Sequence, residues 1–175
     1  MRALLTLYFM PNSYHIRQAT ATDIPVLMQL AGATWGPTYR RILSEEQLDY
    51  MFEVIYSREA LEEQMRQGQT FLLLENEGVP VGFASFSVKD EQAALYKLNK
   101  IYLLPQEQGK GGGKVLLEAV EERVKKLGAK LLDLNVNRHN PAKGFYERCG
   151  YQVHLQEDIP IGPYWMNDFV MRKAL

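Results

Sequence analysis

The sequence predicts a single α/β domain with a mixed, mostly antiparallel sheet of about seven strands flanked by about four helices. Two observations support this class. The 175 residues suit one sizeable hydrophobic core. Short alternating segments dominate the first half of the chain, whereas strands and helices alternate in the second half, which is the order expected of an α/β domain with a mixed sheet. We assign residues 14–175 to this domain and residues 1–13 to an N-terminal extension.

The first half contains three predicted strands and three predicted helices. Thr22, Ser44 and Ser57 are good N-caps, and the last two open runs with apolar residues at helical spacing. The Gly36-Pro37 pair is expected to break the first helix, since proline removes a backbone donor and clashes with the preceding turn. The strands are expected at 14–19, 70–75 and 81–89, and the helices at 23–34, from 44 onwards, and from 57 to 68.

The second half alternates more regularly. Asn140-Pro141 provides an N-cap followed by a proline at the first helical position, and Gly128 and Gly150 are typical of residues that end a helix. The strands are expected at 95–103, 130–136, 151–156 and 167–172, and the helices at 111–127 and 140–149.

The composition excludes several classes of protein. The formal net charge is −1, so a basic surface for nucleic acid is not expected. The single cysteine, Cys149, fits a reducing compartment and a cytoplasmic location. No run of about 20 apolar residues exists, so we expect no membrane partner. The apolar start of the chain is too short for a usual signal peptide, and an additional strand or true initiation at Met10 remain the alternatives.

A glycine-rich loop precedes the helix at 111–127. Four glycines within five residues let the backbone approach a ligand closely, and the helix N-terminus directs unpaired N–H groups at an anion. The loop therefore predicts a phosphate site. It lacks the first glycine and the Ser/Thr of a nucleoside-triphosphate loop, and the last glycine of a dinucleotide fingerprint. The residues are Gln108, Gly109, Lys110, Gly111, Gly112, Gly113 and Lys114.

Three motifs in this chain together resemble one family. Gln108-x-x-Gly111-x-Gly113 follows a predicted strand, and Asn140-x-Ala142-x-x-Phe145-Tyr146-x-x-x-Gly150-Tyr151 follows at the usual separation. Ile16-Arg17-x-Ala19-x-x-x-Asp23 is typical of the start of the same domain. On these motifs, which extend over residue 14 to the C-terminus, the chain resembles the GNAT superfamily of N-acetyltransferases.

The resemblance implies acetyl-CoA as acetyl donor and a GNAT-type fold in which the strands at 98–103 and 130–136 splay apart. The pantetheine arm would enter that gap. The amide of Leu103 would hold the thioester oxygen, and Tyr146 would protonate the leaving thiolate, so these two are the catalytic candidates. The implied donor contacts are Ile101, Tyr102, Leu103, Gln108, Gly109, Lys110, Gly111, Gly112, Gly113, Lys114, Asn140, Lys143 and Tyr146.

Two departures from the family pattern affect the chemistry. His139 stands where many relatives carry the asparagine, so Asn140, Asn137 and His139 are alternatives for the pantetheine contact. Relatives often carry a glutamate before the loop, but residues 97–100 contain no carboxylate, so no general base is assigned. No cluster of metal ligands is evident, and direct transfer to an amine requires no metal.

The acceptor is expected to be the primary amine of a small molecule. Trp35, Tyr39 and Trp165 either line the acceptor mouth or fill the core. Residues 44–66 hold seven acids against two bases, and residues 97–130 hold eight bases against four acids. The acidic segment would attract a cationic acceptor such as a polyamine. A weaker resemblance to the spermidine/spermine-type branch agrees with this. The alternatives are a protein or peptide N-acetyltransferase and a non-catalytic acetyl-CoA-binding module; a homodimer is also left open.

Overall fold

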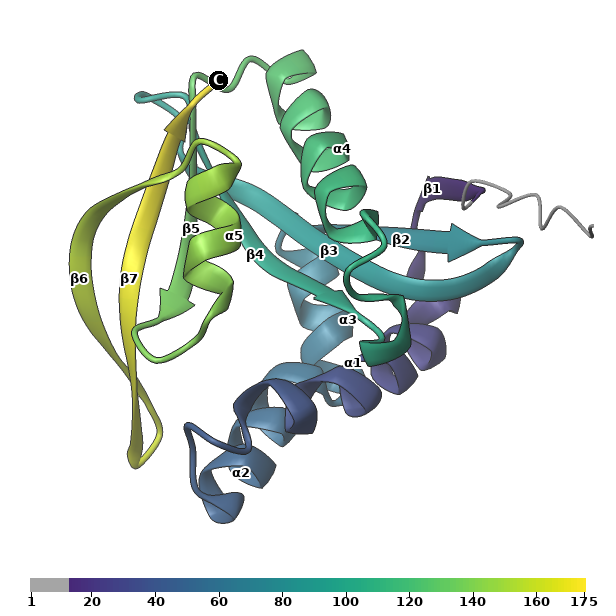
Figure 1. Cartoon of the computed structure of the whole chain (residues 1–175), viewed down its shortest axis with the longest axis vertical. Helices are drawn as coiled ribbons and strands as arrows, with labels where there is room; N and C mark the ends of the chain where they lie inside the picture. The colour runs from purple at the N-terminus through teal and green to yellow at the C-terminus, as the bar shows by residue number, and fades with distance from the viewer. Residues whose placement is uncertain (1–12) are drawn as a thin grey trace, which may run out of the picture.

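The computed structural model describes residues 13–175, and its centre is one seven-stranded sheet (Figure 1). The strand order is β1-β2-β3-β4-β5-β7-β6, and every neighbouring pair is antiparallel except β4 and β5, which run parallel. The predicted mixed, mostly antiparallel sheet of seven strands is thus confirmed. The strands are β1 (Tyr14–Gln18), β2 (Thr70–Asn76), β3 (Val79–Asp90), β4 (Leu95–Leu103), β5 (Leu131–Asn137), β6 (Gln152–Ile161) and β7 (Tyr164–Ala174).

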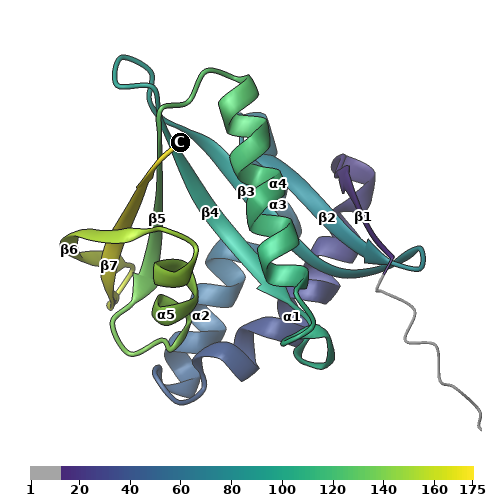
Figure 2. The same ribbon diagram turned by 45° about the horizontal axis from the view of Figure 1, so that its top comes forward.

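Five α-helices cover the two faces of the sheet (Figure 1, Figure 2). One face packs against α1, α2 and α3, and the other against α4 and α5, so that two separate clusters of buried side chains form. The helices are α1 (Ile24–Tyr39), α2 (Glu45–Tyr56), α3 (Arg58–Arg66), α4 (Gly112–Lys126) and α5 (Ala142–Arg148). Residues 1–12, where the N-terminal extension is expected, lie outside the described part of the chain.

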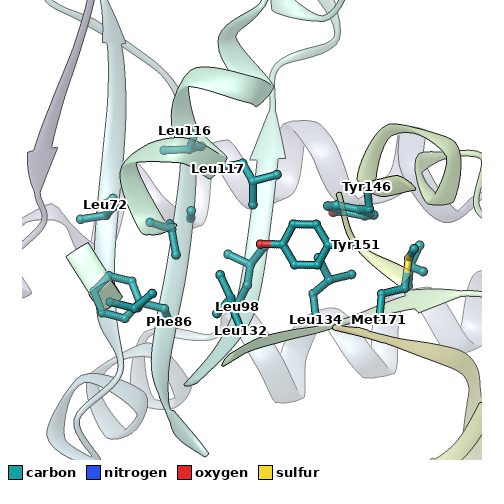
Figure 3. Close-up of a cluster of buried hydrophobic side chains, with 14 of the residues drawn as sticks. Leu72, Phe86, Leu98, Leu116, Leu117, Leu132, Leu134, Tyr146, Tyr151 and Met171 are labelled. Atoms are coloured by element: carbon teal, nitrogen blue, oxygen red, sulfur yellow. The ribbon is translucent and has the colours of Figure 1, made fainter. Parts of the chain in front are cut away.

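The core under α4 and α5 follows directly from helical and strand periodicity (Figure 3). Leu116, Leu117 and Val120 recur on one side of α4 and are at most 1% exposed. They pack on apolar side chains of one sheet face, and Tyr146 and Tyr151 extend the cluster towards β7. This packing holds the N-terminus of α4 and the whole of α5 against the same face of the sheet, where the site is built.

The first helix differs from the prediction. It does not stop at Thr34 but continues through Gly36 and Pro37 to Tyr39. The Thr38 hydroxyl donates to the Thr34 carbonyl at 2.7 Å, and the Arg40 amide donates to the Gly36 carbonyl at 2.9 Å. Burial of Trp35 and Tyr39 in the core under α1–α3 outweighs the lost proline donor, which is a tertiary effect.

The caps predicted at Ser44 and Ser57 are confirmed, but Thr22 is not the N-cap of the first helix. Thr22 lies within a short 3-10 helix (Ala21–Asp23) whose N-cap is Thr20, and α1 follows from Ile24. The Ser44 and Ser57 hydroxyls accept from the backbone amides of Gln47 and Ala60. Gly128 follows α4 with φ +92°, the left-handed conformation that favours glycine after a helix.

The last two strands are longer than predicted. β6 continues past its expected end at 156, and β7 begins before its expected start at 167, so the two strands meet in a tight turn at Gly162-Pro163. Pro160 lies in β6, an edge strand, where a missing N–H donor does no harm to the ladder. The extended hairpin reaches α2, where the Gln47 side chain donates to the Trp165 carbonyl at 3.0 Å. No helix among residues 13–175 is long and apolar enough to cross a membrane.

Candidate active site

The glycine loop lies between β4 and α4 and presents an uncapped helix N-terminus. Gly109 and Gly111 have φ of +77° and +90°, so side chains at these two positions would strain the backbone. No side chain caps α4, because its N-cap is Gly111. The first amides of α4 are therefore available to an anion, as the predicted phosphate site requires.

Gly112 and Gly113 serve a different purpose, which is close packing. A Cβ on Gly112 would lie 3.0 Å from the Leu103 side chain and 3.2 Å from Leu74. A Cβ on Gly113 would lie 3.3 Å from Leu103. The missing side chains let the start of α4 sit directly over the end of β4, so the anion site and the end of that strand are adjacent.

A buried carboxylate that the sequence analysis did not single out anchors the loop. Glu107 is 9% exposed and accepts from the Asn76 amide at 3.3 Å and the Tyr14 hydroxyl at 3.4 Å. It also pairs with Lys110 at 3.2 Å. Lys114 pairs with Glu118 at 3.7 Å. Both lysines of the loop are exposed, and each forms an ion pair with an acid three or four residues away.

The parallel strands β4 and β5 separate, as the resemblance implies. They pair only from Leu95–Leu98 to Leu131–Leu134, and both strands continue beyond this point without pairing to each other. The region between the two unpaired ends is called the opening below. It starts beside Gly112 and Gly113 and ends where β5 reaches Asn137.

The backbone of β4 presents free groups towards the opening. The Leu104 amide donates to the Val81 carbonyl at 2.9 Å, so Leu103 and its partner Gly82 form a pair that exchanges no hydrogen bonds. The N–H and C=O of Leu103, and two residues earlier those of Ile101, therefore point away from β3 and towards β5. The Leu103 carbonyl accepts from the Gln108 side chain at 3.4 Å. Between them, Tyr102 directs its backbone groups to β3.

Tyr146 borders the opening from α5. Its side chain is 8% exposed, and its ring contacts those of Phe145 and Tyr151 at centroid distances of 5.3 and 6.1 Å. Burial raises the pKa of the Tyr146 phenol well above its ordinary value, with a smaller contribution from Tyr39. The phenol is therefore protonated at neutral pH, which is the state that a proton donor needs.

The other two predicted contacts of the second motif lie at the start of α5. The Asn140 side-chain oxygen accepts from the Ala142 amide at 2.9 Å and thus caps the helix. Lys143 pairs with Glu147 at 2.5 Å, and its ammonium lies over the Phe169 ring. Asn137 is 4% exposed and accepts from the His139 amide at 3.0 Å, whereas His139 itself is exposed.

The aromatic residues predicted for the acceptor separate into two groups. Trp35 and Tyr39 are buried at 5% and 9% exposure, and Trp35 donates from its indole to the Leu48 carbonyl at 3.2 Å. Trp165 is 56% exposed and lines a cavity of about 320 Å³ together with Asn137 and His139. Trp35 lines a second hollow of about 480 Å³ between α1 and α2. The structure thus does not bring the three aromatics into one pocket.

Tyrosine hydroxyls from three elements converge at the opening. The Tyr39 hydroxyl on α1 lies 3.3 Å from the Tyr102 hydroxyl on β4. Tyr39 also interacts electrostatically with the phenol of Tyr146 on α5. Burial raises the pKa of Tyr39 and of Tyr102 well above the ordinary value, so all three phenols stay neutral.

A sheet that opens between two parallel strands, next to an uncapped glycine helix terminus, defines an acyl-transfer type of fold and site. A model of the acetyltransferase (GNAT) domain family matches residues 40–162. The chain therefore belongs to the GNAT family of N-acetyltransferases.

Individual relatives agree with this assignment. The chain is 29% identical to a spermidine N(1)-acetyltransferase of Thermoplasma acidophilum over 92% of this chain and 97% of the relative. It is 27% identical to an uncharacterised N-acetyltransferase of Lactobacillus delbrueckii over 91% of this chain and 96% of the relative. Among solved structures, PaiA N-acetyltransferase of T. acidophilum in complex with coenzyme A is similar with a TM-score of 0.79 and 28% identity, covering 93% of this chain and 99% of that one.

Proposed function

We propose that the protein transfers the acetyl group of acetyl-CoA directly to a primary amine of a small, cationic acceptor. The observation that carries this proposal is the opening between β4 and β5, bordered by the uncapped N-terminus of α4 and by Tyr146. The relative named for spermidine supports a polyamine-like acceptor. The structure in complex with coenzyme A supports the donor.

Each group at the opening has a role in this reaction. The amides from Gly109 to Lys114 bind the pyrophosphate, and the pantetheine arm extends along β4 beside Ile101, with Asn140 and Lys143 on the opposite side. The amine attacks the thioester carbon, and the developing oxyanion is held by the Leu103 amide. By analogy with other oxyanion holes, such a donor contributes about 10²–10³ in rate. As the carbon–sulfur bond breaks, Tyr146 donates its proton to the thiolate.

The acceptor end of the site is proposed to lie towards the β6–β7 hairpin. The cavity beside Trp165, at about 320 Å³, is within the range of small-molecule sites. The acidic helices α2 and α3 lie on the same side of the sheet as the Tyr39 and Tyr102 side chains. Both features support a small cation over a protein N-terminus.

The first test is thermal unfolding with and without acetyl-CoA, followed by a panel of amines with thiol release as the readout. Acetyl-CoA at about 100 times its dissociation constant should stabilise the protein by about 2.7 kcal/mol. Thiol release with spermidine but not with peptides would support the proposal. Release with peptides alone would favour a peptide acetyltransferase, and stabilisation without release on any amine would favour a binding module.

A further inference from the structure

The proposed reaction needs a group that takes a proton from the acceptor. A primary amine in water is an ammonium ion near neutral pH, and only its free base can attack a thioester. The middle of β4 offers Lys97, Asn99 and Lys100 in place of a carboxylate. Lys100 donates to the side-chain oxygens of Gln64 and Gln69 at 2.7 and 3.0 Å, within the core under α1–α3, so it is occupied there.

A carboxylate does lie at the opening, and it comes from β7. Asp168 is the register partner of Asn137, three residues beyond Leu134, the last residue of β5 that pairs with β4. Asp168 shares its sheet face with Met166, which packs in the core under α1–α3. The Tyr39 hydroxyl lies close enough that the Asp168 charge contributes to the raised pKa of that phenol.

Asp168 is buried and incompletely hydrogen-bonded. Its residue exposure is 5%. One carboxylate oxygen, Oδ2, accepts from the Asn135 side-chain amide at 3.3 Å, while Oδ1 has no partner among the described residues. Asn135 Oδ1 and Arg138 Nε are the other buried side-chain atoms of residues 13–175 without a partner. Native proteins rarely leave such atoms unpaired, so the unpaired oxygens of Asp168 and of its hydrogen-bond partner Asn135 indicate a place for a polar ligand group.

The two unpaired oxygens are acceptors, and they come from neighbouring strands. An ammonium has three N–H donors and no acceptor, which matches the carboxylate of Asp168 and the amide oxygen of Asn135. The unpaired atom of Arg138 is an N–H donor on a cation, so it cannot bind an ammonium. Its guanidinium pairs with Asp158 at 2.6 Å and lines the cavity beside Trp165.

We propose that Asp168, oriented by Asn135, binds the ammonium group of the acceptor in the opening and accepts its proton. This inference rests on the proposed acetyl transfer and assigns the base of that reaction. Asp168 is a catalytic residue in this assignment because its oxygen contacts the reacting nitrogen, and Asn135 is a positioning residue.

The protons balance through this assignment. One ammonium proton moves to Asp168 Oδ1 and from there to solvent, and the nitrogen lone pair then forms the bond to the thioester carbon. A second proton replaces the one that Tyr146 gives to the sulfur when the carbon–sulfur bond breaks. The third stays on the nitrogen of the product amide. The net products are the acetylated amine, free thiol and one proton.

The charged groups around Asp168 suit this role. Burial raises the pKa of the Asp168 carboxyl, while the Asn135 hydrogen bond and the charge of Lys97 on β4 oppose the shift. Glu157 on β6 raises the pKa further and Arg138 lowers it, and Tyr39 on α1 stays neutral. A carboxylate with a raised pKa is a stronger base, and it remains ionised at neutral pH when cations are near.

The test compares Asp168→Asn with Glu157→Gln, which removes an exposed carboxylate that contacts the same Asn135 side chain at 3.4 Å. Asp168→Asn should lower kcat/KM at pH 7 by about 10²–10⁴. Its stabilisation by acetyl-CoA should stay as in the wild type. The deficit should shrink as pH rises, because free amine then reaches the site without needing a base. Glu157→Gln should remain within about threefold of wild type.

A second variant and a binding measurement complete the test. Asn135→Ala should raise the KM for the amine more than it lowers kcat, because it removes orientation and not the base. Spermidine alone should raise the unfolding temperature of the wild type and leave that of Asp168→Asn unchanged, a readout that needs no turnover. Wild-type kcat/KM in Asp168→Asn, or equal stabilisation of both proteins by spermidine, would overturn the inference. Loss of stabilisation by acetyl-CoA in the wild type would instead count against the proposed function.

Discussion

Tyr146 is the residue on which the proposed chemistry depends most directly. Its phenol is buried and protonated at neutral pH, and its hydroxyl makes no hydrogen bond to another group among residues 13–175. Tyr146→Phe removes the proton donor and little else, so kcat should fall by about 10²–10⁴ while acetyl-CoA binding stays nearly unchanged. Steady-state kinetics with thiol release, together with acetyl-CoA titration, measure both quantities.

The matched control is Tyr151→Phe. Tyr151 belongs to the same buried cluster, 6.1 Å from Tyr146 between ring centroids, but its hydroxyl donates to Glu121 at 3.0 Å, away from the opening. Tyr151→Phe should lower stability by about 1 kcal/mol and leave kcat within about twofold. Equal losses of kcat in both variants would show that packing, and not proton donation, explains the effect of Tyr146→Phe.

Lys100 is a second residue whose pKa is shifted by its burial. Burial, reinforced by the charge of Lys97, lowers the pKa of its ammonium to about 7. The unfolded chain keeps an ordinary lysine pKa near 10.4, so between these values the unfolded state binds one proton that the folded state does not. Folding stability should therefore rise with pH in this interval, by at most about 1.4 kcal/mol per pH unit.

Urea unfolding at pH 7, 8 and 9 measures this effect when the wild type is compared with Lys100→Met. The methionine variant fills a similar volume without a titratable group, so the wild type should gain stability relative to it as pH rises. A constant difference across the three pH values would mean that Lys100 stays charged in the folded protein.

At the scale of elements, a glycine with positive φ stands at each end of α4. Gly111 precedes the helix with φ +90°, and Gly128 follows it with φ +92°, and a Cβ at either position meets no atom within 4 Å. Gly111→Ala and Gly128→Ala should each cost about 1 kcal/mol of stability through backbone strain.

Only Gly111 belongs to the proposed phosphate site. Gly111→Ala should weaken acetyl-CoA binding by about fivefold or more, because the strained loop loses the conformation that directs its amides at the pyrophosphate. Gly128→Ala serves as the control and should bind acetyl-CoA as the wild type does. Calorimetric titration decides between them, and unchanged affinity in Gly111→Ala would remove the loop from the donor site.

At the scale of the whole molecule, the two charged segments lie on different faces of the sheet. The acids of residues 44–66 are on α2 and α3, and most bases of residues 97–130 are in the glycine loop and α4 on the other side (Figure 1). Opposite fields would draw the anionic donor and a polycationic acceptor to different sides of the opening.

This separation predicts a salt effect that depends on the acceptor. At saturating acetyl-CoA, kcat/KM for spermidine should fall more steeply with ionic strength than kcat/KM for a primary amine with a single charge, since steering scales with ligand charge and is screened by salt. Measurements from about 20 to 300 mM salt with both amines test it. Parallel slopes would indicate that the acidic helices do not guide the acceptor.

Much of this protein is determined by local sequence. The alternation of strands and helices, the caps at Ser44 and Ser57, and the glycine loop are all readable because they depend on residues within one turn or one strand. The position of Tyr146 on a helix that follows β5 also comes from a local motif.

Other features are decided only by the tertiary structure, because they depend on residues far apart in the chain. The Tyr39 hydroxyl meets that of Tyr102, which lies 63 positions away in the chain. Helix α1 continues through Pro37 because burial of its last turn in the core stabilises the longer helix. Trp35 and Trp165 have the same side chain, yet one is buried and the other exposed, which the sheet order and the β6–β7 hairpin determine. Asp168 carries no sequence signal at all: its burial and its place at the opening arise only when β7 pairs with β5 beyond the point where β4 has turned away.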